Sequence, residues 1–254
     1  MKKFGFIILI YLILFSNSVI SKNTNLNPIP DSSKQMIVVI VSHQDSSNAI
    51  LIKYERSNSN NKWHKVGNRF EVIVAKRGLA WGNGLHSIDY KEAIKIEGDY
   101  KSPEGVFELS KVFGFSNIAD IQNLKMPYIH ISKMLECVDD KSSKYYNKLI
   151  ERDIVDSVDW NSSEVMIKYK TWYEFGVVVN HNTNPIKKGN GSCIFLHYWE
   201  DENDITSGCT AMEPDKMREI IYWLDRASNP VLVQLSRLHY EKYKSIWKLP
   251  EILK

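Results

Sequence analysis

Cysteine is scarce in this chain, with three residues among 254. A chain of this length can bury a hydrophobic core without covalent cross-links, so the low count excludes no ordinary globular fold. The cysteines form no C-x-x-C pair, and no two histidines follow H-x-x-x-H spacing. A zinc site built from Cys193, His197 and Cys209 therefore lacks the usual ligand spacing. We expect no metal and no cofactor.

An excess of charge of either sign is also missing. The formal net charge is +3, and Lys2 and Lys3 supply two of these charges. Proteins that bind nucleic acid through its phosphates carry a clustered basic face, so we expect no nucleic-acid partner. The two GNG segments, residues 82–84 and 189–191, do not lead from a strand into a helix with Lys-Ser/Thr. They are interpreted as turns and not as phosphate-binding loops.

Long hydrophobic runs are absent after the N-terminus. The chain opens with Lys2 and Lys3, an apolar run over residues 4–15, and then small and polar residues. This is the layout of a secretory signal peptide, and the run is short for a membrane span, which needs about 20 residues. Cleavage after Ser21 or Ser18 leaves no stable span, and a retained anchor is the alternative. We expect an exported protein of the periplasm or cell envelope.

Short apolar or alternating runs dominate the rest of the chain and predict a mainly β protein. Strands are expected at residues 36–41, 49–55, 70–75, 127–132, 164–170, 175–181, 193–199 and 231–236. A glycine-broken loop is expected at 77–85, a turn leading into a strand at 102–110, and a short helix at 142–150. No internal repeat is visible.

The clearest helix begins at Pro214, which suits the first position of a helix. Met217, Ile220, Ile221 and Leu224 follow at i, i+3, i+4 and i+7, the spacing of one helical face. We expect a signal peptide over residues 1–21, a linker over 22–35, one catalytic domain over 36–236, and a basic aromatic tail over 237–254.

The context of each cysteine separates the three. Cys209 follows Gly208 in a turn, with the expected helix just behind it. Backbone N–H groups near a helix start can lower a thiol pKa and hold an oxyanion. Cys137 and Cys193 have no such context. We therefore interpret Cys209 as the free thiol and expect Cys137 to be available to pair with Cys193 in a disulfide.

A thiol nucleophile needs a base. His197 ends the expected strand CIFLH, and a loop then leads to the turn that carries Cys209, so the two side chains could meet. His181, at the end of GVVVNH, is the second candidate or a supporting residue.

Two segments, IFLHYW…TSGCTAM and KIEGDYKSPEGVFELSKVFGF, resemble the signature of the L,D-transpeptidase (YkuD-type) catalytic domain. In that family a histidine precedes a loop that ends in a Ser/Thr-x-Gly-Cys turn, and an EGD-x-x-(T/S)P-x-G-x-(F/Y) segment lies upstream. The resemblance covers residues 36–235. It implies a single β-sandwich domain with a few helices and a thiol in a groove.

The resemblance also implies an activity and a set of roles. Family members attack a peptidoglycan stem peptide between an L-centre of a diamino acid and a terminal D-alanine, form a thioester, and pass the acyl group to an amine. This implies a part in peptidoglycan biosynthesis, cell wall organization and cell shape. On this resemblance Cys209 is the nucleophile, His197 is the base, and the carbonyl of Tyr198 orients the imidazole. Thr206 matches the family's Ser/Thr. The turn and oxyanion positions are Ser207, Gly208 and Thr210.

Three departures from the family pattern leave alternatives open. Ser207 stands where many members have His, eleven residues separate His197 from Cys209, and Ala211 stands where most have Arg or Asn. The lost Arg would help to hold a substrate carboxylate. A carboxypeptidase or amidase that hands the thioester to water is therefore one alternative, and a cell-wall-binding module without turnover is another.

Overall fold

The computed structural model describes residues 27–87, 91–201 and 203–252. The expected signal peptide and the first part of the expected linker lie outside the described residues, and the domain boundaries stay a prediction. Ile29, just before the first strand, is buried in the domain. In the described part of the chain, no helix is long and apolar enough to cross a membrane.

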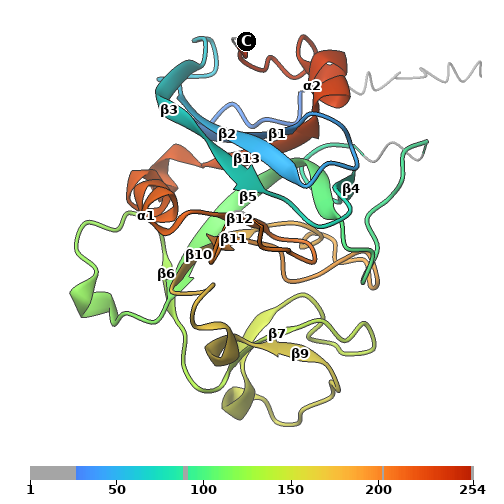
Figure 1. Cartoon of the computed structure of the whole chain (residues 1–254). Helices are drawn as coiled ribbons and strands as arrows, with labels where there is room; N and C mark the ends of the chain where they lie inside the picture. Colours follow the sequence, from blue (N-terminus) through green and yellow to red (C-terminus); the bar gives the residue numbers. More distant parts are fainter. Residues whose placement is uncertain (1–26, 88–90, 202, 253–254) are drawn as a thin grey trace, which may run out of the picture.

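The described residues form a mainly β structure, as expected (Figure 1). Its strands and α-helices are β1 Gln35–Val41, β2 Asn48–Glu55, β3 His64–Ile73, β4 Leu79–Trp81, β5 Ser102–Gly114, β6 Tyr128–His130, β7 Leu135–Val138, β8 Leu149–Glu151, β9 Ser163–Val165, β10 Phe175–Val179, β11 Phe195–Tyr198, β12 Thr210–Met212, α1 Pro214–Trp223, β13 Val231–Ser236 and α2 Arg237–Tyr243. Four short 3-10 helices connect some of them.

The main sheet closes on itself. Its strand order is β10-β11-β12-β3-β2-β1-β13-β5, and β5 pairs in turn with β10. β4 and β6 are attached to β5, which is the longest strand. The mainly β class is confirmed, but in place of the two packed sheets of a sandwich the structure has one closed, mixed sheet whose two faces are both packed.

Strand β1 shows why the sheet is buried on both faces. Its sequence QMIVVIV is apolar at every position after the first, the pattern of a strand with no solvent-facing side. Ile37 and Val39 pack in the core inside the closed sheet. Met36 and Val38 pack in a second cluster on the opposite face, with Tyr240 of α2.

Helix α1 forms as its spacing predicts. Pro214 occupies the first turn and Asp215 lies near the positive end of the helix dipole. Met217, Ile220 and Ile221 are fully buried in the core inside the closed sheet. The helix therefore contributes its apolar face to the same core as β10 and β11.

A small three-stranded sheet, in the order β8-β7-β9, lies below the main sheet (Figure 1). It occupies the segment between β6 and β10 and packs through a third apolar cluster, which includes Cys137 and Met166 from its side and Phe113 and Phe195 from the main sheet. Cys209 belongs to the same cluster. The small sheet thus covers the region where the expected nucleophile lies.

The helix expected at residues 142–150 is wrong. Residues 149–151 form β8, and the preceding residues form turns. Asp140 accepts from the backbone N–H of Ser142, and Asp159 accepts from that of Lys144. Asn147 has a φ of 61°, in the left-handed region. Side chains that bond nearby backbone groups compete with helix formation.

Two other expected segments differ. The strand expected at 164–170 ends at Val165, and Met166–Tyr169 is a 3-10 helix whose Met166 is buried. The expected loop at 77–85 contains β4, which pairs with the beginning of β5. The turn expected at the start of 102–110 is strand from Ser102 onward.

The C-terminal tail packs on the domain through a buried polar cluster. Glu104 of β5 is fully buried and accepts hydrogen bonds from Ser236 and from Nδ1 of His239, at 2.8 and 2.7 Å. His239 Nε2 lies 3.2 Å from Glu92. Glu104 raises the pKa of His239 through this hydrogen bond. The cluster therefore binds α2 to the strand that follows the EGD segment.

Gly105, next to Glu104, is required by close packing. A Cβ at this position would lie 1.9 Å from Cε1 of His86, and the residue has a φ of 139°. A side chain here would therefore displace the buried His86 ring.

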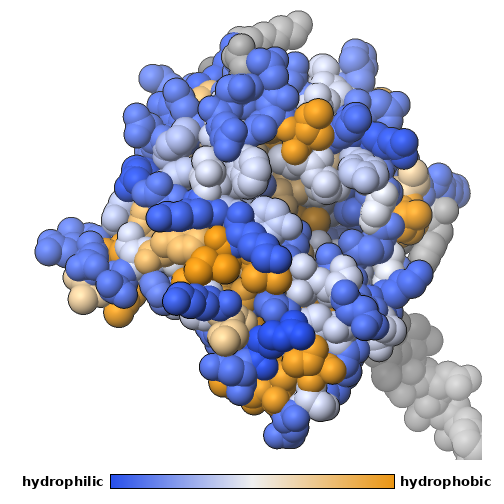
Figure 2. All heavy atoms as spheres, turned by 60° about the horizontal axis from the view of Figure 1, so that its bottom comes forward, coloured by the Kyte–Doolittle hydropathy of each residue, from blue (hydrophilic) through white to orange (hydrophobic). Residues whose placement is uncertain are grey.

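The surface carries no single large apolar patch in the view of Figure 2, where apolar side chains form several separate groups among polar ones. Exposed apolar residues are scattered over loops and helices, including Ile118, Ile154 and Leu238. Such scattered exposure is normal for a folded protein.

The His239–Glu104 contact predicts a pH-dependent stability. The pKa of His239 is higher in the folded than in the unfolded protein. The contact therefore contributes fully to the free energy of unfolding below the unfolded pKa of about 6.5, and this contribution is lost as the pH rises through the folded pKa. At low pH the free energy of unfolding should be about 1.5–3 kcal/mol higher for wild type than for His239→Gln. At high pH this difference should be smaller. Urea unfolding of both proteins at two pH values checks this.

His43→Gln, at an exposed position, is the matched control and should change little at either pH. An equal difference between wild type and His239→Gln at both pH values would contradict the prediction.

Candidate active site

The pairing of β11 with β12 brings the two expected catalytic residues to one face. The strands are parallel, and Leu196 lies opposite Thr210 and His197 opposite Ala211. Side chains alternate along a strand, so Phe195 and His197 point away from the core that holds Leu196. Cys209 directly precedes β12, and its Sγ accepts from the backbone N–H of Phe195 at 3.3 Å.

The imidazole of His197 has a defined tautomer. Its Nδ1 lies 2.6 Å from the carbonyl oxygen of Tyr198, which can only accept. Nδ1 therefore carries the hydrogen, and Nε2 presents its lone pair. Burial lowers the pKa of His197 to about 4. The rings of Tyr173 and His197 pack in a T-shaped arrangement, with centroids 5.4 Å apart. The structure thus holds a neutral imidazole whose Nε2 accepts no hydrogen bond from any residue that the structure describes.

The thiol of Cys209 is buried and neutral in this arrangement. Sγ donates to the carbonyl oxygen of Cys193 at 3.5 Å and forms no hydrogen bond with His197 in the described part of the chain. Burial raises the pKa of the thiol, and the nearby Glu164 adds to the effect. Both members of the pair are therefore uncharged at neutral pH.

The helix behind Cys209 begins at Pro214 as expected, but a strand separates it from the thiol. Residues 210–212 form β12, and α1 begins only at Pro214. The N–H groups of a helix start therefore do not act on the thiol, which agrees with its raised pKa.

Two hydroxyl groups fix the turn that carries Cys209. Thr206 Oγ1 and Ser102 Oγ both donate to the carbonyl oxygen of Cys209, at 2.6 and 3.1 Å. Ser102 also accepts from the N–H of Ala75 at 2.9 Å, and it is completely buried. Thr206 was expected near the site, whereas Ser102 was missed. Ser102 begins the SPEG segment, which was expected to be a turn leading into a strand, and nothing local to that segment indicates a contact with Cys209.

The other three turn residues, Ser207, Gly208 and Thr210, lie differently relative to the thiol. Ser207 is exposed and lines the cavity at the thiol. Gly208 has no positive φ, and a Cβ on it would lie 3.0 Å from Cδ1 of Ile194, a close contact that the end of the Ile194 side chain would have to relieve by a small shift. Thr210 Oγ1 bonds to Gln234 at 2.7 Å, on the face away from the cavity. Only the backbone of Thr210 faces the neighbourhood of the thiol.

His181 lies apart from the thiol and has both ring nitrogens occupied. Nε2 donates to the carbonyl of Asn190 at 2.8 Å, and Nδ1 accepts from the N–H of Asn83 at 3.3 Å. Burial lowers the pKa of His181 to about 3. The side chain therefore connects two loops and has no free nitrogen for proton transfer.

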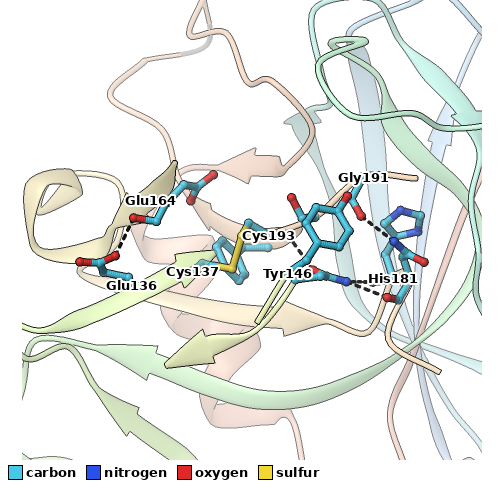
Figure 3. Close-up of a disulfide and its surroundings, with 12 residues drawn as sticks. Glu136, Cys137, Tyr146, Glu164, His181, Gly191 and Cys193 are labelled. Carbon is cyan, nitrogen blue, oxygen red and sulfur yellow. Dashed lines mark hydrogen bonds between the residues drawn. A yellow bond between two sulfur atoms is a disulfide. The ribbon is translucent and has the colours of Figure 1, made fainter. Parts of the chain in front are cut away.

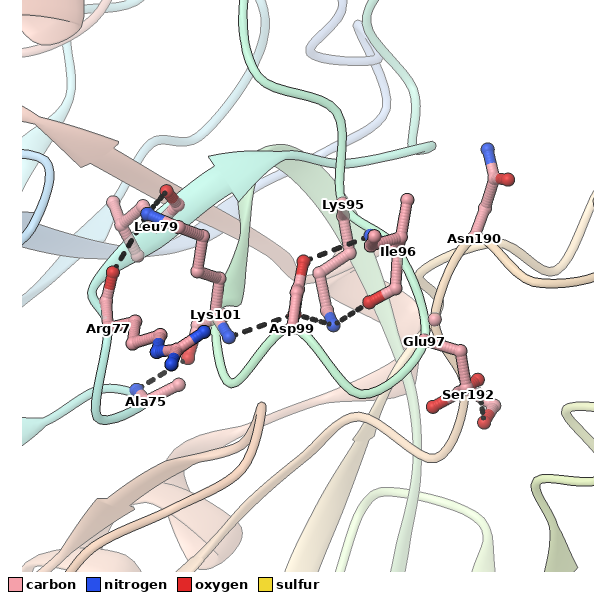
Figure 4. A network of polar contacts seen from close by, with 12 residues as sticks. Ala75, Arg77, Leu79, Lys95, Ile96, Glu97, Asp99, Lys101, Asn190 and Ser192 are labelled. Carbon is pink, nitrogen blue, oxygen red and sulfur yellow. Dashed lines mark hydrogen bonds and ion pairs between the residues drawn. The ribbon is translucent and has the colours of Figure 1, made fainter.

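A cavity of about 390 Å³ contains Cys209 and His197. Its charged lining is mainly acidic, with Glu97, Asp139 and Glu164 against Lys95. Lys95 is itself buried and donates to Asp99 at 2.6 Å (Figure 4). Its charge is therefore already neutralised, and the cavity presents an excess of carboxylates.

The EGD segment is a structural part of this cavity. Glu97 accepts from Ser192 and from the hydroxyl of Tyr146, and Asp99 accepts from the N–H of Ile96 at 2.9 Å. Figure 4 shows the contact between Glu97 and Ser192. These carboxylates hold the loops that surround the thiol.

Cys137 and Cys193 are joined in a disulfide, between Tyr146 and His181 on one side and Glu164 on the other (Figure 3). Cys193 is thus no thiolate ligand for the zinc site considered above. Its φ of 55° is unusual for a residue other than glycine. The N–H of Cys193 donates to Asn147 at 3.0 Å, and its carbonyl faces the thiol. The disulfide therefore links the small sheet to the residue that contacts the nucleophile.

Comparison with known proteins supports the resemblance. A family model described as "YkuD: L,D-transpeptidase catalytic domain" matches residues 58–233. No curated protein matches the chain significantly. Among solved structures, a similar one is the crystal structure of the helical cell shape determining protein Pgp2 from Campylobacter jejuni, with 13% identity and a TM-score of 0.37. The match covers 79% of this chain and 47% of that one, so the chain spans about half the length of that protein.

The two hydroxyl donors predict the effect of removing one. Thr206→Val keeps the shape of the side chain and leaves the buried Cys209 carbonyl with Ser102 alone. Unfolding free energy should fall by about 1–3 kcal/mol because a buried polar contact is lost. Denaturant titration measures the change.

Ser207→Ala is the control, since Ser207 is exposed in the same turn, and it should cost little. If both variants were equally stable, the role assigned to Thr206 would be wrong.

Proposed function

Because the chain belongs to the L,D-transpeptidase catalytic domain family, we propose that it is a cysteine acyltransferase that acts on peptidoglycan stem peptides through a thioester on Cys209. One observation carries the proposal. The hydrogen bond from His197 to the carbonyl of Tyr198 leaves Nε2 as a proton acceptor, in the same cavity as the only thiol outside the disulfide.

The first step needs a proton transfer, because the resting thiol is neutral. As Sγ attacks the carbonyl carbon of the donor peptide, the thiol proton passes to Nε2 of His197. The C–N bond to the terminal residue then breaks, and the imidazolium returns its proton to the leaving amine. The products are a thioester on Cys209 and a free amino acid, with His197 neutral again.

In the second step an amine attacks the thioester carbon. His197 takes the proton of that amine and returns it to the thiolate as the C–S bond breaks. Water in place of the amine gives hydrolysis by the same route. Both outcomes use the same two residues, so product analysis is needed to separate them.

The charges of the cavity suit a donor with an ammonium group. Three carboxylates line it, and Asp139 Oδ1 is buried without a hydrogen-bond partner. Burial raises the pKa of Glu164 to about 7, so a cationic group nearby would favour its charged form. A diamino acid supplies such a group. Ala211, opposite His197, brings no cation for a substrate carboxylate.

We further propose that the protein acts outside the cytoplasm. A disulfide persists in oxidising compartments, and peptidoglycan lies there too. The expected N-terminal signal peptide agrees with this location.

Acylation by a carbapenem tests the proposal directly. A β-lactam of this class is opened by a reactive thiol, and the adduct is visible by mass spectrometry of the intact protein. Wild type should gain the mass of one carbapenem, and Cys209→Ala should gain none while keeping its circular dichroism spectrum. A folded wild type that is never acylated would favour a binding module without turnover.

Replacement of the base should slow acylation strongly. His197→Gln removes the proton acceptor, and general-base help is worth roughly 10²–10⁴-fold in rate. Raising the pH should restore part of the rate in His197→Gln, because the thiol then ionises without a base. A free thiol ionises at about pH 8.5, and the buried Cys209 thiol needs a higher pH. In wild type the rate should fall only as the pH drops toward 4, where His197 becomes protonated.

His181→Gln is the matched comparison, and it should cost much less because His181 transfers no proton. The measurement is the rate of adduct formation over a range of pH. Equal losses in the two variants would reassign the base.

A further inference from the structure

A second groove lies on the outer face of the main sheet, over β1, β2 and β3. Its volume is about 630 Å³, larger than that of the cavity at the thiol. Apolar side chains from β1 and β2, Ile40, Ile50 and Ile52, form its floor. Nothing in the proposed mechanism uses this groove.

The walls of the groove come from two functional segments. Trp199 and Asn203, from the connection between His197 and Cys209, line the groove. Arg237 at the start of α2 lines it too. The connection that carries the catalytic turn therefore faces this groove on one side and the thiol cavity on the other.

A smaller cavity of about 270 Å³ lies between the two spaces. It shares Asn48, Ile73 and Asn203 with the groove, and it shares Ile205 with the cavity at the thiol. Ile205 is 64% exposed, so an apolar side chain lies open at the junction. The groove, the smaller cavity and the thiol cavity therefore follow one another along residues 203–205, and we call this series of spaces the path.

The charges change sign along this path. The thiol cavity is acidic, whereas Arg69 and Arg237 line the groove and Lys76 lines the junction. These three cations are exposed, and none forms an ion pair with a residue that the structure describes. Of the acids along the groove and junction, Glu71 is exposed, and Asp204 already accepts from Trp172 and from the N–H of Glu200.

We infer that this groove binds the acceptor strand, as an anionic peptide whose carboxylates meet Arg69, Arg237 and Lys76 while its amine reaches the thioester on Cys209. The inference rests on the proposed function and adds a site to it. An acceptor stem peptide carries both free carboxylates and the attacking amine. The path offers cations at one end and an acidic cavity at the other, the order that such a peptide needs.

The apolar floor and Trp199 suit the remaining parts of the acceptor. Alkyl side chains of the peptide can lie on Ile40, Ile50 and Ile52, and the half-buried Trp199 ring offers a face to a sugar or a methyl group. Because the donor occupies the thiol cavity, the acceptor must approach from another side. The junction at Ile205 provides that approach.

Binding of a defined muropeptide tests the inference. The probe is a disaccharide-tetrapeptide, and its affinity is measured by calorimetry on the full chain with Cys209→Ala, which prevents turnover. Adding Arg69→Glu and Arg237→Glu should weaken binding by about tenfold or more, because two ionic contacts become repulsive. Raising the salt concentration should weaken binding to the parent protein more than to this variant.

The matched control is Lys65→Glu, an identical charge change on the same strand β3 at an exposed residue that lines none of the three spaces. It should leave the affinity unchanged. A muropeptide with amidated carboxylates should bind the Cys209→Ala protein and its charge variants with the same affinity. That affinity should be lower than the affinity of the unamidated muropeptide for the Cys209→Ala protein.

Carbapenem acylation separates this inference from the proposed function. With Cys209 intact, Arg69→Glu with Arg237→Glu should be acylated at the wild-type rate, while transfer to an acceptor falls about tenfold relative to hydrolysis. If wild type is not acylated, the proposed function fails, and the binding measurement still judges the groove. If Arg69→Glu with Arg237→Glu left the muropeptide affinity unchanged, the inference would be overturned. It would also be overturned if these substitutions changed the oligomeric state and not the affinity.

Discussion

Parallel strands that lie side by side must be joined by a segment that returns the chain to its starting end, usually over a dozen or more residues and through a helix. Here residues 199–209 alone join β11 to β12, without a helix. So short a return cannot bury a core of its own. It is held by bonds to its neighbours, with Thr206 bonded to Lys76 and Asp204 to Trp172. Cys209 ends this return, so strand register sets its position relative to His197.

Burial then decides the charge state of the site. A thiolate and an imidazolium in a dry cavity would each lose their hydration, and the mutual attraction need not repay that loss. The carboxylate of Glu164 further disfavours a thiolate. The neutral pair avoids this cost at rest, and charge develops only when substrate is present. The hydrogen bond to Tyr198 matters for this reason, because it keeps Nε2 ready without a permanent charge.

Local patterns were enough for part of this picture. The alternating runs gave most strands of the main sheet, the spacing after Pro214 gave α1, and the His–Cys spacing gave the two residues that share a cavity. What failed depended on distant partners. Asp159 bonds the backbone of Lys144, fifteen residues away, and prevents the expected helix. Ser102 reaches Cys209 across 107 positions, and no local signal indicates such a contact.

The contact of the buried thiol with Cys193 also bears on survival in an oxidising environment. Disulfides are exchanged by thiolates, and an attacking group that stays protonated reacts slowly. A thiol with a raised pKa, placed beside a residue whose sulfur is already paired, is a poor attacker of that pair. The feature that makes Cys209 dependent on His197 thus also protects it from scrambling. The nucleophile can remain reduced while its two neighbours remain joined.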